Sequence, residues 1–236
     1  MPTLLFRLCG PLQSWGTRSR FTERDTELEP SKSGVIGLVC AALGRPREED
    51  ISDLTSLKMG VRVDHEGTMA RDYHTAGTGS GIVRAGGGIS QNAVLSNRYY
   101  LAGADFLVGL EGDTGLLTTI EAALREPVWQ LSLGRKAFVP GVPVVLPRSG
   151  LRDVSLREAL ESEPWPLTPV TWAPPLGMVS QKLRLVVDSS FDMPGHEVRM
   201  DQPLGAAFRD RTFGPRPILQ DYFDKERTDV PQQTHT

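Results

Sequence analysis

Cysteine is scarce in this sequence: Cys9 and Cys40 are the only two among 236 residues. Cys9 lies in a pattern typical of a strand and Cys40 in a pattern typical of a buried helix. Two isolated thiols of this sort favour reduced core residues over a disulfide or a metal site. None of the four histidines has a cysteine, an aspartate or a second histidine at a spacing typical of zinc sites. We therefore expect neither a metal nor another cofactor.

Long hydrophobic runs are absent as well. The apolar stretches are too short to span a bilayer, and the N-terminus lacks the basic flank and small-residue cleavage site of a signal peptide. A composition of 39% hydrophobic and 23% charged residues is ordinary for a globular protein, and the length suffices for one core and a smaller second unit. These features predict a cytoplasmic protein without a membrane segment.

Excess positive charge is also missing, because the net charge is −3. This value argues against a chain that coats nucleic acid indiscriminately. Acidic residues are nevertheless absent from 73–104 and from 127–152, and both ranges contain arginine. The distribution has two interpretations: chance clustering, or two surfaces that face phosphates while the remaining surface contacts protein partners.

Hydrophobic periodicity predicts a regular succession of strands and helices in the first half of the chain. The expected elements are a strand at 3–8, a helix at 33–43, strands at 59–64 and 105–110, a helix at 114–126 and a strand at 128–133. The range 59–64 alternates cleanly and predicts a half-buried strand. The order is that of the ferredoxin-like fold, which many RNA-binding modules use, so the predicted class is α+β.

A long insertion interrupts this predicted core between its second and third strands. The range 72–97 contains a glycine cluster between β-type flanks, which predicts a protruding β-hairpin with a mobile tip. A capping box at Ser155 opens a short helix, and 192–221 is rich in proline, glycine and arginine. We predict a ferredoxin-like domain at 1–150, a small β-rich C-terminal domain at 151–223 and a flexible tail at 224–236.

Motifs for nucleotide binding and hydrolysis are missing. The glycine cluster neither follows a buried strand nor opens a helix, and no Walker-type run or nucleophile motif occurs. One catalytic alternative stays open: His74 as a general base, with Tyr73 and Lys136, could cleave RNA without a metal. Nothing in the sequence indicates that these three residues converge.

The first candidate binding loop follows the first predicted strand. Gln13 and Trp15 lie in a polar turn, and a basic loop with Arg18, Arg20 and Arg24 comes after it. Indole and guanidinium groups together suit a stacked base and a phosphate. We expect Trp15 to stack on a base and Gln13 to read a base edge; the alternative is that Trp15 only covers the core.

Two further positions suit a phosphate. Lys32 and Ser33 stand at the start of the helix 33–43, where unpaired N–H groups and the helix dipole attract an anion. Gly134, Arg135 and Lys136 follow the last predicted strand, where a glycine permits close approach beside two cations. Ordinary capping by the serine and a solvated turn are the respective alternatives.

Five motifs follow one another along the chain. They are Leu-x-Gly-Pro-Leu-Gln-Ser-Trp-Gly at 8–16, Pro-Ser-Lys-Ser-Gly-Val-Ile-Gly-Leu at 30–38, Arg-Asp-Tyr-His-Thr at 71–75, Arg-Tyr-Tyr-Leu at 98–101 and Leu-Gly-Arg-Lys at 133–136. In this order and spacing they resemble the CasD family, subunits of the type I-E CRISPR Cascade complex within the RAMP superfamily. The resemblance covers nearly the whole chain and implies a RAMP domain with a thumb-like hairpin and a smaller C-terminal β domain.

The resemblance also implies a function. Members of that family bind the repeat-derived 5′ handle of CRISPR RNA (crRNA) and cap one end of the backbone filament, built from the CasC subunit. They also contact the large subunit CasA, so that target DNA is met indirectly. The implied role is non-catalytic, because a separate subunit cuts the precursor RNA.

On this basis the candidate RNA-binding residues are Gln13, Trp15, Arg18, Arg20, Lys32, Ser33, Arg71, Tyr73, His74, Arg84, Arg98, Gly134, Arg135 and Lys136. A last basic group, Arg209, Arg211 and Arg216, is as well suited to a protein partner as to RNA.

Overall fold

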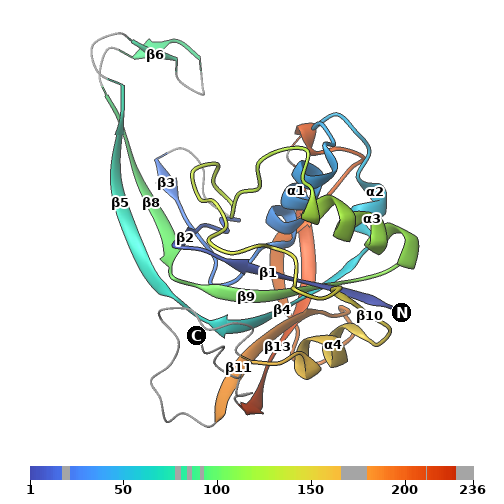
Figure 1. The fold of residues 1–236 in the computed structure, drawn as a ribbon. Coiled ribbons are helices and arrows are strands. Elements are labelled where there is room, and N and C mark those ends of the chain that lie inside the picture. The colour runs from blue at the N-terminus through green and yellow to red at the C-terminus, as the bar shows by residue number, and fades with distance from the viewer. Residues whose placement is uncertain are drawn as a thin grey trace, which may run out of the picture.

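The computed structural model describes residues 1–17, 22–77, 81–83, 87–90, 93–165, 180–210 and 212–226. A large antiparallel sheet runs through the molecule, and a long β-hairpin projects from it (Figure 1). The strands of the sheet, in spatial order, are β10 (Leu151–Arg152), β1 (Thr3–Cys9), β9 (Asp105–Glu111), β4 (Lys58–His65), β11 (Ser180–Asp188), β13 (Phe213–Glu226) and β12 (Glu197–Pro203).

Helices cover both faces of the sheet. α1 (Lys32–Leu43) and α3 (Thr114–Arg125) pack together on one face, and α4 (Leu156–Ser162) lies on the other against β1, β4 and β9. α2 (Ser52–Thr55) is a single turn between α1 and β4. The predicted helices at 33–43 and 114–126 are confirmed as α1 and α3, and the α+β class is confirmed with them.

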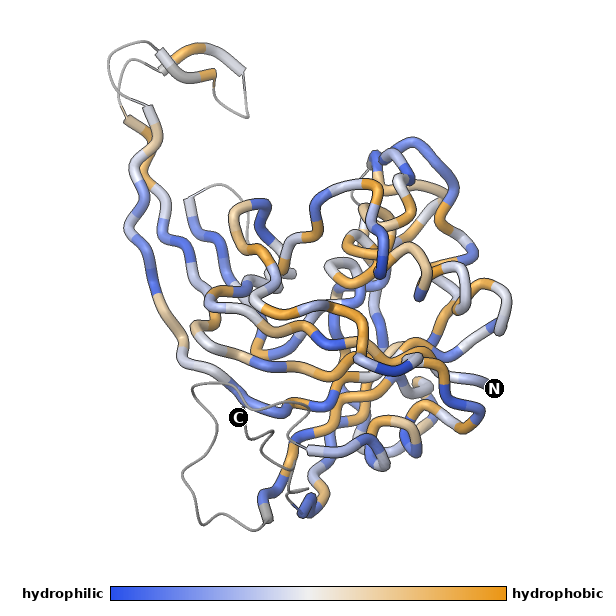
Figure 2. Tube along the Cα trace, viewed as in Figure 1, coloured by the Kyte–Doolittle hydropathy of each residue, from blue (hydrophilic) through white to orange (hydrophobic). Residues whose placement is uncertain are grey.

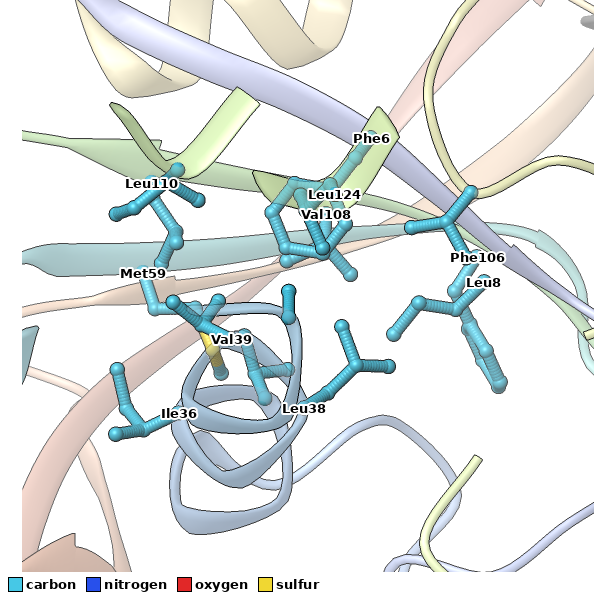
Figure 3. Packing of buried hydrophobic residues seen from close by; sticks show 14 of the residues in the cluster. Phe6, Leu8, Ile36, Leu38, Val39, Met59, Phe106, Val108, Leu110 and Leu124 are labelled. Atoms are coloured by element: carbon cyan, nitrogen blue, oxygen red, sulfur yellow. The ribbon is translucent and has the colours of Figure 1, made fainter. Parts of the chain in front are cut away.

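Side-chain alternation along the central strands builds two cores. Phe6 and Leu8 of β1 point to the core under α1 and α3, whereas Leu5 points to a smaller core under α4 (Figure 3). The central strands are accordingly among the most hydrophobic parts of the chain (Figure 2). The strands expected at 3–8, 59–64 and 105–110 are confirmed as β1, β4 and β9.

The half-buried character predicted for 59–64 is wrong, because α4 covers the second face of β4. Arg62 and Asp64, which look solvent-facing in the sequence, are both buried. Arg62 Nε donates to Asp64 at 2.6 Å, and its Nη1 donates to the carbonyl oxygens of Leu160 and Glu163 at the end of α4. A charged pair that also satisfies the end of a helix can thus stay buried.

The strand predicted at 128–133 is wrong as well. Val128 and Trp129 donate their backbone N–H groups to the carbonyl oxygens of Ala42 and Ala41 at the end of α1, and both side chains are exposed. The place beside β1 is taken by β10 and by the irregular segment before it, which forms a bridge between Phe6 and Val145. Leu131 and Leu133 are buried in the main core, so the alternation belongs to an irregular segment that packs on the core without pairing as a strand.

The C-terminal strands continue the same sheet. β11 pairs with β4 and with β13, so the β-rich part after residue 150 is hydrogen-bonded to the N-terminal strands. Strands from both sides of the boundary predicted at residue 150 belong to one continuous sheet. The division into two domains stays a prediction. Residues Asp224–Glu226 of the predicted tail belong to β13, and the rest of that tail lies outside the described residues. The short helix predicted after Ser155 is confirmed as α4, but the Ser155 side chain makes no capping hydrogen bond; at the start of the helix the Glu111 carboxylate accepts from Leu156 N.

The projecting hairpin consists of β5 (Thr68–Ala76) and β8 (Val94–Ala102), which pair over their full length. It begins before residue 72 because β5 continues β4, and it extends past residue 97 because β8 runs on into β9. The short strands β2 (Leu12–Gln13) and β3 (Glu23–Arg24) flank β8, and β6 (Ile82–Val83) and β7 (Ile89–Ser90) lie near the tip. Part of the predicted tip lies outside the described residues.

No helix in the described ranges is both long and apolar enough to cross a membrane. The same ranges contain no group of three or more histidine, cysteine, aspartate or glutamate side chains placed to hold a metal ion.

The placement of the two cysteines yields a test of the core. Cys9 and Cys40 are buried, and burial raises the pKa of each thiol to about 11. Near pH 8 about one thiol in a thousand is therefore ionised, and only the thiolate reacts. We expect neither thiol to react with Ellman's reagent in the folded protein, and both to react in guanidinium chloride. Rapid labelling of the folded chain would contradict this packing.

Candidate nucleic-acid interface

The hairpin has two faces, because successive side chains of a strand point to opposite sides and directly paired residues share a side. The inner face, as it is called below, carries Asp72, His74, Ser96, Arg98 and Tyr100. β3 continues this face, since Arg24 pairs with Arg98. The inner face therefore brings together parts of the chain that are far apart in the sequence.

Arg135 reaches the inner face from a turn at 133–138. Its guanidinium carbon lies 5.2 Å from the ring centroid of Tyr100 and 5.8 Å from that of Phe138. Its Nη2 donates to the carbonyl oxygens of Arg24 and Tyr99, each at 3.3 Å. A planar cation stacked on two rings thus ties β3 and β8 to the turn.

Positive charge is concentrated at this point. The pKa of Arg135 lies below its usual value, first because partial burial removes water and then because Arg98 and Arg24 place positive charge nearby. Asp72 and Asp25 act in the opposite sense but do not outweigh these effects. In the described part of the chain, no ion pair joins Arg135 to a carboxylate. Such a group favours an anion with several acceptor oxygens, as in a phosphate.

Lys136 is exposed beside this cluster, and Gly134 fixes the turn that carries it. Gly134 has a φ of +88°, and a Cβ at this position would overlap the carbonyl oxygen of Ser14. Ser14 in turn donates its backbone N–H to Leu133 at 3.1 Å. The close approach that this glycine permits is therefore made to the chain's own Gln13–Trp15 loop.

Gln13 and Trp15 are buried, with exposed fractions of 0% and 1%. Gln13 Nε2 donates to the carbonyl oxygens of Leu8 and Ala104, and its Oε1 accepts from Trp15 Nε1 at 3.2 Å. The indole packs against Gly34 in the first turn of α1, where an added Cβ would lie 2.8 Å from the ring. Because their polar atoms are already paired, neither side chain is available to a base in this structure. Trp15 lies where the alternative prediction places it, against the core.

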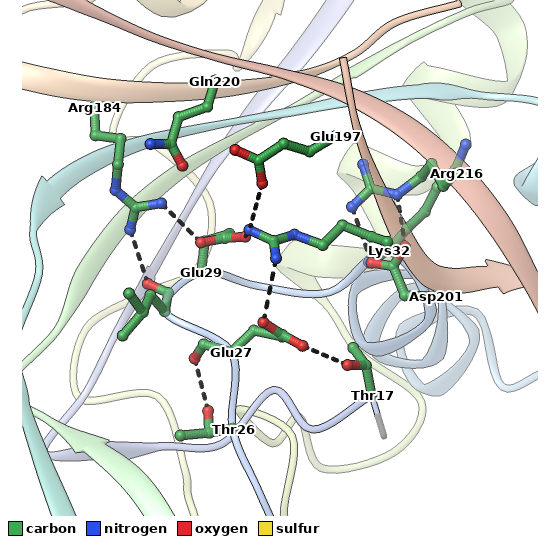
Figure 4. Close-up of polar contacts among 12 residues, drawn as sticks. Thr17, Thr26, Glu27, Glu29, Lys32, Arg184, Glu197, Asp201, Arg216 and Gln220 are labelled. Carbon is green, nitrogen blue, oxygen red and sulfur yellow. Dashed lines mark hydrogen bonds and ion pairs between the residues drawn. The ribbon is translucent and has the colours of Figure 1, made fainter. Parts of the chain in front are cut away.

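The N-terminus of α1 already holds an anion. Asp201 of β12 accepts from Lys32 N at 2.7 Å, and Figure 4 shows it beside Lys32 and Arg216. Lys32 Nζ lies 3.0 Å from Asp188. Arg216 pairs with both carboxylates, which raise its pKa although burial alone would lower it. The phosphate site expected at Lys32 and Ser33 is therefore filled by the chain's own carboxylate, and Lys32 is buried.

Several other predicted site residues lie apart from the cluster. Ser33 is half-buried next to Ser31, which is the residue that caps α1. Arg71 and Tyr73 are exposed on the opposite, outer face of the hairpin. His74 is on the inner face, with its Nδ1 3.2 Å from Asp72.

The remaining candidates divide into two groups. Arg18, Arg20, Arg84 and Arg211 lie outside the described residues, so their roles stay predictions. Arg216 is buried in the pairs with Asp188 and Asp201, so it does not belong to a basic surface patch, whereas Arg209 is exposed.

Sequence reasoning did not place Tyr100 and Phe138 at the site, and it noted Arg24 only as part of a basic loop. Both rings lie within or just after motifs that contain arginine, at 98–101 and 133–136. This proximity in sequence gave no indication that one guanidinium stacks on both rings, because the two segments meet only in the fold.

The contact between Gly134 and Ser14 can be tested by comparing two glycines of positive φ. Gly103→Ala, at a φ of +68° with open space around it, should cost about 1 kcal/mol of the free energy of unfolding from backbone strain alone. Gly134→Ala adds the overlap with Ser14, so we expect a loss of more than about 3 kcal/mol. Urea titrations of both variants measure the difference; equal losses would contradict the close approach.

Comparison with known proteins places these features in a family. The family model described as "CRISPR-associated protein (Cas_Cas5)" matches residues 3–218. The "CRISPR system Cascade subunit CasD" of Escherichia coli (strain K12) is 33% identical over 149 residues, which are 57% of this chain and 65% of that protein. The alignment thus spans just under two thirds of the relative's length.

Solved structures cover nearly the whole chain. A chain described as "Crystal structure of Cas protein" is 41% identical with a TM-score of 0.74, and the match covers 97% of this chain and 99% of that one. A chain from a "CRISPR RNA-guided surveillance complex" is 33% identical with a TM-score of 0.77, covering 98% and 95%. The chain therefore belongs to the Cas5 family of CRISPR-associated proteins.

Proposed function

We propose that this chain is a non-catalytic subunit of a Cascade-type CRISPR surveillance complex and binds the 5′ handle of crRNA on the inner face of its hairpin. The observation that supports this most directly is the gathering of Arg24, Arg98 and Arg135: Arg24 pairs with Arg98 in the strand register, and these two arginines lower the pKa of Arg135 more than Asp72 and Asp25 raise it. Family membership and the likeness to a chain of an RNA-guided surveillance complex indicate the class of anion.

The proposed contacts divide between charge and stacking. Arg98 and Lys136 hold phosphates, because Arg98 is only half-buried and Lys136 is exposed. Arg135 fixes the surface on which they stand, since its hydrogen bonds go to backbone carbonyl groups and its plane rests on Tyr100 and Phe138. An exposed guanidinium or aromatic plane can also stack on an unpaired base, which contributes about 1–3 kcal/mol.

The arrangement supports the non-catalytic reading over the ribonuclease alternative. Metal-free cleavage of RNA needs a base and an acid on either side of one phosphate. Tyr73 and His74 are consecutive residues of β5 and point to opposite faces, while Lys136 stands on a separate turn. These three side chains therefore do not surround one phosphate in this arrangement.

The proposed partners follow from the same family relation. The chain would cap one end of the backbone filament of CasC subunits and support the large subunit CasA in the cytoplasm, so that target DNA is met indirectly in antiviral defence. The hairpin offers room for this, because its outer face and tip are not occupied by the inner-face cluster.

Replacing two of the proposed phosphate contacts should weaken binding of a single-stranded repeat RNA. We expect Arg98→Gln with Lys136→Gln to lower the affinity about 100-fold and to make the salt dependence of log K less negative by about 1.4, because two phosphates are no longer neutralised. Fluorescence anisotropy at several salt concentrations measures both quantities on the full chain.

A matched control is Arg47→Gln, in the exposed loop after α1 and away from the hairpin. It should leave both the affinity and the salt dependence unchanged. An unchanged salt dependence in the double variant would place the RNA elsewhere on the chain.

The ribonuclease alternative predicts a different result for one histidine. His74→Ala should leave the length of the RNA that co-purifies with an assembled complex unchanged, because His74 is paired with Asp72 and takes no part in cleavage in this proposal. Sequencing of the bound RNA from both complexes gives the length; accumulation of uncut precursor in the variant would restore the nuclease interpretation.

A further inference from the structure

The outer edge of β5 is long and unpaired. β5 pairs with β8 along one edge over nine residues, and the register shows no bulge. In the ranges that the structure describes, no backbone group of Thr68–Ala76 bonds to a strand other than β8. A row of N–H and C=O groups therefore faces outward along the whole strand.

The other edges of the same molecule carry devices that prevent pairing. β12 has a register shift between Arg199 and Gln202, ends in Pro203 and turns the charged side chains of Arg199 and Asp201 inward. β10 has only two residues. The part of β13 that extends beyond β12 is rich in charged residues, including Lys225.

β5 is long and regular in register, and its charged residues are limited to Arg71 and Asp72. Its sequence contains no proline and no lysine, and it exposes Met69 at 47% and Tyr73 at 60%. Natural sheets protect long exposed edges against pairing with other chains. The contrast within one chain indicates that this edge is kept open for a strand.

We propose that the outer edge of β5 takes an extended strand from a different protein, which lengthens the hairpin sheet by β-augmentation. This inference rests on the chain's being a subunit of a complex but not on the proposed RNA contacts, which lie on β8, β3 and the 133–138 turn. The backbone rows favour a polypeptide, because an extended strand repeats the same alternation of N–H donors and C=O acceptors at the same spacing.

The side chains of β5 specify the chemistry of the incoming strand. On the outer face Met69, Arg71 and Tyr73 alternate as apolar, cationic and aromatic groups. A complementary strand carries an acidic residue opposite Arg71 between two apolar residues, since opposite charges and apolar pairs stabilise neighbouring strands. A second copy of this chain is a poor match, because on the outer face its own β5 would add another Arg71 and no carboxylate.

Hydrogen exchange followed by mass spectrometry tests the proposal. In the isolated full chain, alternate amides of Thr68–Ala76 should exchange as fast as exposed loops, because they point outward. In a complex assembled by co-expression of the surveillance-complex proteins, the same amides should exchange at least about 100-fold more slowly. Protection in the isolated chain, or none in the complex, would overturn the proposal.

Two further outcomes identify other occupants, and each would also overturn it. Protection by a repeat RNA alone would assign the edge to nucleic acid, and protection that grows with the concentration of the isolated chain would assign it to a second copy.

A pair of variants then separates edge pairing from packing on the outer face. The first variant is Tyr73→Pro. Asn97 donates its N–H to Thr22 on the other side of β8, so the directly opposed Tyr73 has its N–H outward, and β5 keeps its bonds to β8. We expect about 10-fold weaker incorporation into the complex, equivalent to one lost hydrogen bond. The control is Leu95→Lys on β8, a residue 45% exposed on the same face but away from the edge, which should change incorporation less than about 3-fold.

The affinity of the isolated proline variant for repeat RNA keeps this proposal distinct from the RNA site. It should be unchanged. Loss of RNA affinity together with loss of incorporation would mean that the variant acts through the inner face, and a Leu95→Lys variant that is impaired as much as the proline variant would point to face packing.

Discussion

The positive end of α1 needs an anion, and the carboxylate of Asp201 supplies it from the last strand of the sheet. Because the site is buried, an unpaired carboxylate there would be costly, and Arg216 and Lys32 neutralise the pair formed by Asp201 and Asp188. This ionic group joins residues near the start of the chain to residues near its end. Through this group, the C-terminal strand β12 caps the N-terminus of α1, the helix that covers the main core.

The consequence for function is a division of the cations into two classes. Buried cations such as Arg62, Arg184 and Arg216 are matched by the chain's own carboxylates or by helix carbonyl groups, and they hold the fold together. At the inner face of the hairpin, by contrast, Arg135 lies near Arg98 and Arg24, and these two arginines act on it more strongly than Asp72 and Asp25 do. A net negative chain can therefore present a local site for a phosphate, because net charge does not report how charges are paired.

The same pairing of buried charges limits what can be predicted from the sequence. Periodicity located α1, α3 and the central strands because each buries a regular apolar face, which is a local property. It misjudged Arg62 and Lys32, since a charge that will be buried against a distant partner looks like a charge that will face water. The exposure expected of Trp15 was misjudged for a related reason: its polar neighbour Gln13 accepts from the indole N–H inside the core. Arg135 and Lys136 lie in a turn, and their role in RNA binding stays a prediction; the aromatic support of Arg135 depends on tertiary contacts that the sequence does not show.

The proposed RNA site and the proposed strand-binding edge share one hairpin because the hairpin extends the central strands. β5 and β8 continue β4 and β9, and the ribbon leaves the sheet at Gly67 and Gly103, whose φ angles of 72° and 68° are positive. At Gly67 a Cβ would lie 2.8 Å from the carbonyl oxygen of Ala102, so the direction of the ribbon is set by the backbone at this bend. Alternation then places the cationic group on one face, and pairing with β8 leaves the opposite edge of β5 open. Since both features share one stiff ribbon, a strand added at the outer edge would hold the inner face in place against the RNA.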